Sequence, residues 1–287
     1  MTTAEFLKAI FSEAIDSEHQ LSIFGLPSRA IKRFTNIDEA VAYIARQSEN
    51  VYFGLGLIKG NPPGRGKLKD ISAICSLWAD IDVAGSEHSK PNLPLSIEEA
   101  RALLTQIPLK PSILVHSGGG LHPHWIFKEP WLLDTEAERA AAATLSRRLA
   151  GTLRNAAAGG GMDLDNTGAL TQVLRPPETL NRKYDPPIKV QALEQTDLRY
   201  LPDDFEDILL DDKLCQVSQV VEIGDIVLKT GAEPPGTKFA ALMENDPKFK
   251  KSWKRARPDL QDQSASAYCC SLASIAAAAG WTDQEIA

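Results

Sequence analysis

The amino-acid sequence predicts a mixed α/β catalytic core followed by a smaller helical domain. Segments with helical periodicity alternate with short apolar segments typical of strands up to residue 193. Residues 236–287 carry little strand signal and include a helix rich in small residues that ends at Gly280. The length of 287 residues, with 43% hydrophobic and 24% charged residues, is typical of a globular core with an added domain. We expect domains at residues 1–205 and 206–287.

Each element of the core follows from periodicity, capping residues or chain breakers. Ser96 and Glu99 form a capping box at the start of one expected helix. Pro-Pro and glycines predict a loop over residues 61–70. Helices are expected over residues 3–16, 37–47, 96–107 and 134–155. Strands are expected over residues 51–60, 71–83 and 188–193, and residues 111–127 read as strand, glycine turn and strand.

Composition excludes several classes of protein. A net charge of −7 is unlike a basic nucleic-acid coat protein, so nucleic-acid contacts are expected from local patches such as KFKKSWKRARP at 248–258. The four cysteines fit neither a disulfide framework nor a paired zinc motif, which favours a reduced, cytoplasmic setting. No apolar run approaches the ~20 residues of a membrane span, so no membrane contact is expected.

Two aspartates end the apolar segment SLWADIDV. Residues i and i+2 of a strand point to the same side, so Asp80 and Asp82 project together while Ile81 points into the core. Parallel carboxylates repel unless a cation lies between them, and Mg²⁺ and Mn²⁺ take oxygen ligands of this kind. The pair predicts a metal site at a strand end. The alternative is an exposed strand end with solvated acids.

The segment VHSGGGLHPHW combines a glycine triplet with a histidine pair. Three glycines, Gly118, Gly119 and Gly120, allow backbone N–H groups to approach an anion closely, and Ser117 precedes them. His122 and His124 alternate onto one face of the next strand. This pattern favours phosphate binding. The alternative is a hairpin turn with ordinary surface histidines.

A third polar segment, MDLDNTGALTQVLRPPETLNRK, supplies acids and then basic and amide groups. Asp163 or Asp165 would complete a two-metal site for phosphoryl transfer. Arg175, Asn181 and Lys183 suit a triphosphate or a strand backbone. The alternative is a polar loop after a helix.

These motifs, in this order, resemble the archaeo-eukaryotic primase superfamily, in particular the primase-polymerases of phages and plasmids. Its catalytic subunits carry a hydrophobic-Asp-x-Asp strand, a Ser/Gly turn leading to a histidine and a later acidic residue, here LWADID, SGGGLH and MDLDNTG. In this branch an Arg-Pro-x-x-Thr-x-Asn-x-Lys segment follows, here RPPETLNRK. The resemblance covers roughly residues 50–195 and implies an α/β core with an RRM-like antiparallel sheet.

The resemblance assigns roles to particular residues. It implies that two Mg²⁺ or Mn²⁺ ions bind Asp80, Asp82 and a third acid, for which Asp165 fits the pattern better than Asp163. It implies that His122 contacts the phosphates of the nucleotide, while His124 stands where relatives often have tyrosine. The chain departs from the family at Pro177-Glu178-Thr179, where relatives usually have Pro-Gly-Thr, and a carboxylate there argues against phosphate contact by that turn. The nucleotide-binding set is Ser117, Gly118, Gly119, Gly120, His122, Arg175, Asn181 and Lys183.

The C-terminal stretch resembles a small helical domain that assists template binding and primer initiation in several of these enzymes. Its basic run with Phe249 and Trp253 predicts a stacking and phosphate-binding surface, and a solvated linker is the alternative. Template contacts are expected from Arg65, Lys67, Lys250, Lys251, Trp253, Lys254 and Arg255.

The resemblance therefore implies a DNA primase-polymerase, a nucleotidyltransferase that makes and extends primers on single-stranded DNA from dNTPs or NTPs in phage or plasmid replication. The chain ends in the first turn of a capped helix, so we expect it to continue beyond residue 287, where a helicase domain or partner would lie. Two other classes share parts of the pattern. A DxD glycosyltransferase uses paired aspartates without a template, and a non-catalytic replication initiator binds origin DNA but is expected to lack the carboxylates.

Overall fold

The computed structural model describes residues 1–85, 92–215, 234–260, 263 and 265–286. Contacts between residues divide the chain into two compact units, Met1–Val217 and Ser218–Ala287. Residues 206–215, which the sequence analysis grouped with the second domain, include the short helix α5 (Asp212–Cys215). This helix contacts α4 (Glu136–Gly159), so it packs with the first unit.

Four helices of the first unit begin where the sequence predicts them. The side chains of Thr2, Asn36, Ser96 and Thr135 each accept a hydrogen bond from the backbone N–H of the third helical residue, which satisfies an otherwise unpaired donor. The first three helices end a few residues earlier than expected. They are α1 (Thr3–Phe11), α2 (Ile37–Ile44) and α3 (Ile97–Leu103).

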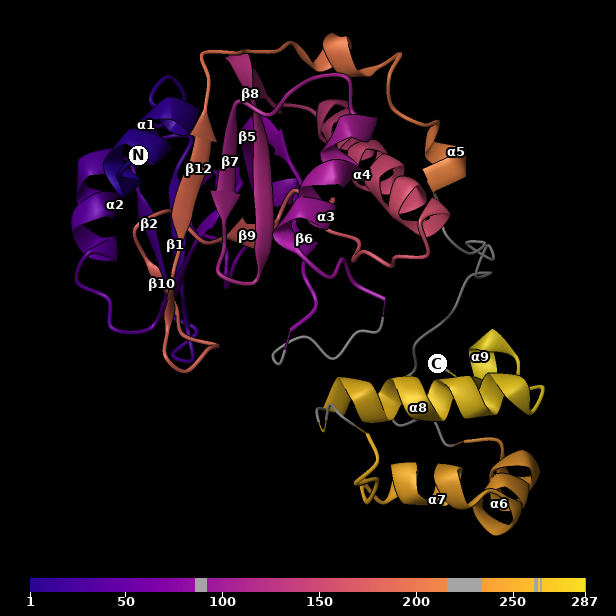
Figure 1. The fold of residues 1–287 in the computed structure, drawn as a ribbon. Helices are drawn as coiled ribbons and strands as arrows, with labels where there is room; N and C mark the ends of the chain where they lie inside the picture. The colour runs from indigo at the N-terminus through magenta and orange to yellow at the C-terminus, as the bar shows by residue number, and fades with distance from the viewer. Residues whose placement is uncertain (86–91, 216–233, 261–262, 264, 287) are drawn as a thin grey trace. The chain divides into compact units, whose positions relative to one another are not determined.

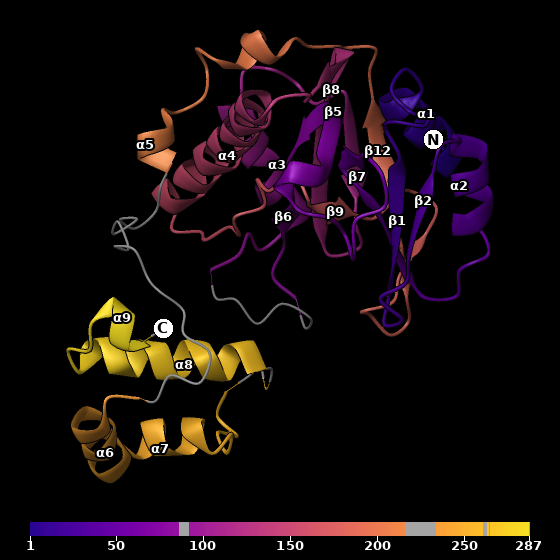
Figure 2. The ribbon, with the colours of Figure 1, turned by 180° about the vertical axis from the view of Figure 1, so that it is seen from behind.

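A small antiparallel sheet has the strand order β2-β1-β3-β9. Its strands are β1 (Leu21–Leu26), β2 (Ile31–Phe34), β3 (Asn50–Gly54) and β9 (Val173–Leu174). Alternation along the strands buries Leu21, Ile23 and Phe53 in the core. In Figures 1 and 2, α1 and α2 flank β1 and β2. The β1–β2 hairpin is absent from the sequence-based expectations.

A larger sheet carries the two aspartates. Its order is β12-β7-β8-β5-β4, and β6 pairs with β8. Its strands are β4 (Gly56–Ile58), β5 (Ile71–Trp78), β6 (Ile81–Asp82), β7 (Ile113–His116), β8 (Gly120–Leu132) and β12 (Gln191–Gln195). Figures 1 and 2 show α3 and α4 on one side of β5 and β8, with α1 and α2 on the other. A short hairpin of β10 (Leu180–Asn181) and β11 (Ile188–Lys189) forms a separate two-stranded sheet, and β10 contacts β3 of the small sheet.

The expected strand over residues 51–60 is two strands in different sheets. The chain changes sheet at Leu55, between Gly54 and Gly56. A Cβ on Gly56 would lie 2.7 Å from the carbonyl oxygen of Leu170, so this crossing needs glycine. The crossing connects the small sheet directly to the sheet that carries the aspartates.

The described residues of the second unit form helices and turns. The helices are α6 (Gly236–Asn245), α7 (Pro247–Trp253), α8 (Ala265–Ala278) and α9 (Asp283–Ile286). Phe249 is buried between Phe239 and Trp281, with ring centroids at 5.8 Å and 6.1 Å. Gly280, with φ of 78°, follows the end of α8 as expected. Among the helices that the structure describes in either unit, none is long and apolar enough to cross a membrane.

Candidate functional site

One pocket of about 200 Å³ gathers most of the predicted site residues of the first unit. The chain leaves β5 at Trp78 and pairs again as β6, with fully buried Ile81 between the two aspartates. Asp80 and Asp82 both line the pocket, so the same-face placement inferred from the sequence is present in the structure. The remaining polar residues of the lining are Tyr52, Ser117, His122, Gln172, Arg175, Asn181 and Lys183.

The Asp80 carboxylate lies in a cationic environment. Its side chain is 21% exposed, and Oδ1 lies 3.3 Å from Nε2 of His122. Burial raises the pKa of Asp80, but His122 and, more weakly, Arg175 and Lys183 together outweigh it and hold the pKa below its usual range. Asp80 is therefore an anion at neutral pH and is available to a metal ion.

His122 and His124 share a face of β8 but have different surroundings. His122 lines the pocket, whereas His124 is fully buried against Phe6, with ring centroids 5.3 Å apart. Burial lowers the pKa of His124 to about 3, so this imidazole is neutral at physiological pH. Neither of its ring nitrogens has a hydrogen-bond partner among the described residues. His124 therefore belongs to the core and His122 to the site.

Arg175 is a buried cation held by an aromatic ring. Its Nη2 donates a hydrogen bond to Tyr52 Oη at 2.5 Å, and its guanidinium carbon lies 4.5 Å from the Tyr52 ring centroid. The side chain is buried, and burial lowers the pKa of Arg175 without removing its charge. Its Nε has no hydrogen-bond partner within the described part of the chain. Because Arg175 also lines the pocket, its guanidinium supplies positive charge there.

Asn181 braces the pocket from the β10 hairpin. Its Nδ2 donates to the carbonyl oxygen of Ser117 at 2.9 Å, and its Oδ1 accepts from the backbone N–H of Lys183 at 3.2 Å. The side chain is buried and its polar atoms are engaged within the protein. Asn181 therefore fixes the glycine turn and the backbone of Lys183 relative to each other.

One glycine of the triplet lines the pocket, and the other two allow close packing of neighbouring segments. Ser117 and Gly119 line the pocket, while Gly118 has φ of 89° and a Cβ there would lie 3.0 Å from Asn181 Cβ. A Cβ on Gly120 would lie 2.2 Å from the carbonyl oxygen of Ile81. Gly120 is thus required for β6 to pair beside β8, and this pairing places Asp82 in the pocket.

Several predicted residues lie outside this pocket. Asp163 and Asp165 are exposed and are not among its lining residues. Arg65 and Lys67 are exposed on the loop before β5. Among the residues that the structure describes, no group of three or more His, Cys, Asp or Glu side chains could hold a metal ion. The assignment of Asp165 as a third ligand stays a prediction.

The residues present nevertheless fit a divalent cation bound together with a substrate. Mg²⁺ in phosphate-transfer sites is held by one or two carboxylates plus phosphate oxygens and water, rather than by a cage of protein ligands. Asp80 and Asp82 supply two carboxylates, and Arg175 and Lys183 supply positive charge in the same cavity for the phosphates.

Tyr52 is the site residue that the sequence analysis missed. It stands in an apolar strand, VYFGLGL, in which nothing distinguishes it from an ordinary core tyrosine. Asn50, two residues earlier, accepts a hydrogen bond from the backbone N–H of Arg182 at 2.9 Å, and its Oδ1 lies 3.4 Å from Arg175 Nη2. The period of two that places Asp80 beside Asp82 also places Asn50 beside Tyr52.

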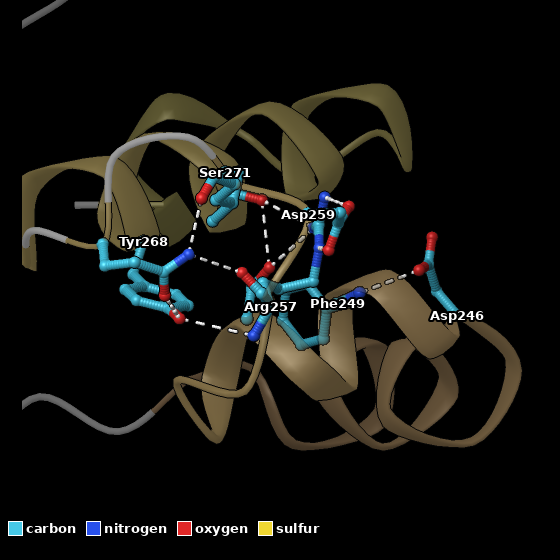
Figure 3. Close-up of polar contacts among 9 residues, drawn as sticks. Asp246, Phe249, Arg257, Asp259, Tyr268 and Ser271 are labelled. Atoms are coloured by element: carbon cyan, nitrogen blue, oxygen red, sulfur yellow. Dashed lines mark hydrogen bonds and ion pairs between the residues drawn. The ribbon is translucent and has the colours of Figure 1, made fainter.

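The basic run of the second unit divides into exposed and buried members. Trp253 is 49% exposed, and the side chains expected to bind template around it (Lys250, Lys251, Lys254 and Arg255) are exposed. The expectation that Phe249 contributes a stacking surface is wrong, because its ring is 2% exposed in the core of the unit. Arg257 is buried too and donates to both Asp259 carboxylate oxygens at 2.7 Å (Figure 3). Its Nη1 also donates to Ser252 Oγ of α7 at 3.1 Å and to Ser271 Oγ of α8 at 3.2 Å, so Arg257 links two helices of the unit.

No protein-family model and no curated protein matches the chain. Among solved structures, the chain is similar to the AEP domain of the cyanophage S-2L primase-polymerase, with a TM-score of 0.49 and 15% identity, covering 72% of this chain and 97% of that chain. It is also similar to the primase RepB′, with a TM-score of 0.42 and 10% identity, covering 99% and 90%. Its similarity to the catalytic domain of RepB′ in complex with initiator DNA has a TM-score of 0.39 and 11% identity, covering 69% of this chain and 88% of that chain. With TM-scores below 0.5, the case for a function depends on the site residues themselves.

Proposed function

We propose that this chain is a DNA primase-polymerase that makes and extends primers by metal-dependent nucleotidyl transfer. The observation that carries the proposal is the pocket beside β6, in which two carboxylates and several cationic or neutral donors face one cavity. This combination suits a nucleoside triphosphate, whose phosphates bind the cations directly and the carboxylates through a divalent metal. The ordered motifs in the sequence support the same assignment.

The carboxylates and the donors have separate roles in this proposal. Asp80 and Asp82 hold Mg²⁺ or Mn²⁺, and Asp165 is the proposed third ligand of a two-metal site. Bound metal ions neutralise phosphate charge and lower the pKa of the attacking hydroxyl. The 3′-oxygen of the primer forms a bond to the α-phosphorus, the bond from that phosphorus to pyrophosphate breaks, and the hydroxyl proton passes to water.

The nucleotide-binding side chains orient the triphosphate for this displacement. Arg175 lines the pocket and is fixed by Tyr52, so its guanidinium is a positioned positive charge for the phosphates. His122, Lys183, Ser117 and the backbone amides of the glycine turn are proposed as further phosphate contacts. Asn181 acts indirectly, because it positions the turn through Ser117.

Extension of a labelled primer on a single-stranded template tests the proposal against its two competitors. Template-dependent incorporation of nucleotides supports a primase-polymerase. Transfer from a nucleotide sugar without a template would instead identify a glycosyltransferase, and DNA binding with no incorporation would identify an initiator. As an internal check, His122→Ala should raise the apparent KM for nucleotide more than His124→Ala does, because only His122 lines the pocket.

A further inference from the structure

A row of aromatic and guanidinium groups crosses the small sheet and ends in the pocket. Phe24 and Tyr52 are cross-strand partners on β1 and β3, with ring centroids 6.0 Å apart. The guanidinium carbon of Arg65 lies 5.6 Å from the Phe24 ring centroid, and that of Arg175 lies 4.5 Å from the Tyr52 centroid. The order Arg65, Phe24, Tyr52, Arg175 therefore leads from a surface loop to the proposed phosphate site.

The row lies on the face of the sheet opposite the core. Ile23 and Phe53, which alternate with Phe24 and Tyr52 along the strands, are buried in the hydrophobic core. Next to the row the sheet carries two small residues, Ser22 and Gly54. A narrow hollow of about 10 Å³ lies beside them, and Phe24 and Arg65 both line it.

The loop that carries Arg65 is fastened to the sheet by Arg33 of β2. The Arg33 guanidinium donates to Asn61 Oδ1 at 2.6 Å and to the carbonyl oxygens of Pro62 at 2.9 Å and Gly64 at 2.7 Å. These three bonds hold the loop backbone immediately before Arg65. Arg65 is exposed, so its guanidinium can turn from the Phe24 ring toward a phosphate when a base occupies the ring face.

The narrow hollow adjoins the pocket on one side and a second basic position on the other. It shares Gln172 and Val173 with the pocket, and it shares Leu170 and Thr171 with a wider hollow of about 440 Å³. The wider hollow is lined by Lys67 and Arg147, the latter on α4. Residues 170–173 thus line three neighbouring hollows between the proposed catalytic site and the cations Lys67 and Arg147.

We propose that a single-stranded DNA template follows a track over these neighbouring hollows, with one base stacked on Phe24 and phosphates bound by Arg65 and Lys67. The inference rests on the proposed function and specifies where its template lies. Aromatic faces interleaved with cations are what unpaired nucleic acid needs, because each base has an exposed face and each link a negative charge. A duplex offers no free base face to Phe24. With a net charge of −7, the protein depends on such local basic positions for affinity.

Binding of a fluorescently labelled oligo-dT to the full chain, measured by anisotropy at several salt concentrations, tests the track. Phe24→Leu should weaken binding about tenfold at each salt concentration, because leucine has no ring face on which a base can stack. Phe24→Tyr keeps the ring and should bind like the wild type. Arg65→Ala and Lys67→Ala should each make the slope of log K against log salt shallower by about 0.7, the value for one phosphate on a single strand.

Lys32→Ala is the matched control for Arg65→Ala and Lys67→Ala. It removes one exposed cation as they do, but from β2. The Lys32 ammonium lies over the rings of Phe34 and Tyr43, away from the row, so this variant should leave both affinity and slope unchanged. The track is wrong if Arg65→Ala and Phe24→Leu bind the oligonucleotide like the wild type, or if a duplex of equal length binds as tightly. Altered binding without nucleotide incorporation by the wild type would instead refute the proposed function and leave the track standing.

Discussion

Replacing His124 with phenylalanine should reduce the loss of folding stability that the first unit suffers when the pH is lowered. The imidazole is fully buried, its ring packs against Phe6 and Phe53, and its two nitrogens lack hydrogen-bond partners in the described residues. Protonation would place a charge in this apolar site, which is why burial lowers the pKa to about 3. Phenylalanine keeps a planar ring at the same position and cannot be protonated.

The pH dependence follows from the difference between the folded and unfolded pKa values of His124. In the unfolded chain a histidine has a pKa of about 6.5. Between pH 6.5 and 3 the unfolded state therefore binds a proton that the folded state does not, and stability falls as the pH is lowered through this window. This difference in pKa makes the free energy of unfolding about 2 kcal/mol lower at pH 5 than at pH 7. Above pH 7 the contribution is negligible.

Urea unfolding of the wild type and His124→Phe at pH 7 and pH 5 measures this term. Emission from Trp78 and Trp125, both fully buried, reports on the first unit. The loss of stability from pH 7 to pH 5 should be about 2 kcal/mol smaller in His124→Phe. Comparing the two losses cancels any packing change that the larger ring introduces. Equal losses in both proteins would refute the assignment of a neutral, buried His124.

Three further substitutions test the geometry elsewhere in the chain. Gly120→Ala should cost about 1–3 kcal/mol by overpacking and abolish incorporation, because its Cβ meets the Ile81 carbonyl and displaces β6; urea unfolding and primer extension measure both. Glu178→Gly should raise the melting temperature by about 1–3 °C, because Glu178 has φ of 69°, which disfavours residues with a Cβ. Arg257→Lys should lower the melting temperature of the second unit alone in calorimetry, because lysine cannot form the two-point contact with Asp259.

Local pattern predicted much of the fold and part of the candidate site. A strand period of two is enough to place Asp80 with Asp82, and the structure also has His122 and His124 on one face of β8. The capping box of Ser96 and Glu99, which acts within one turn, predicted the start of α3, and periodicity predicted α1 and α2. The same local reasoning could not tell which histidine meets the core, because that depends on Phe6 from the N-terminal helix.

The missed features depend on contacts distant in sequence. Tyr52 joins the site only because β9 brings Arg175 beside β3, and a run of apolar strand residues gives no sign of that. The sequence predicts Gly120 as a phosphate-binding residue, whereas the structure shows that Gly120 is needed because the Ile81 backbone packs against it. In the second unit, charge composition alone did not separate buried Arg257 from its exposed neighbours. The hairpin of β1 and β2 has a weak local signal, because the adjacent apolar residues in LSIFGL interrupt the alternation typical of a half-buried strand.

The most direct measurement is single-turnover incorporation of one nucleotide into a primed template by Asp80→Asn and Asp82→Asn. Each substitution keeps the side-chain size and removes the charge needed to hold a divalent cation. Asp134→Asn, which changes an exposed acid outside the pocket, is the matched control. The account predicts a loss of at least about a hundredfold for both pocket variants, in line with removal of a principal source of electrostatic stabilisation, and a wild-type rate for the control. Incorporation at the wild-type rate by either folded pocket variant would contradict it.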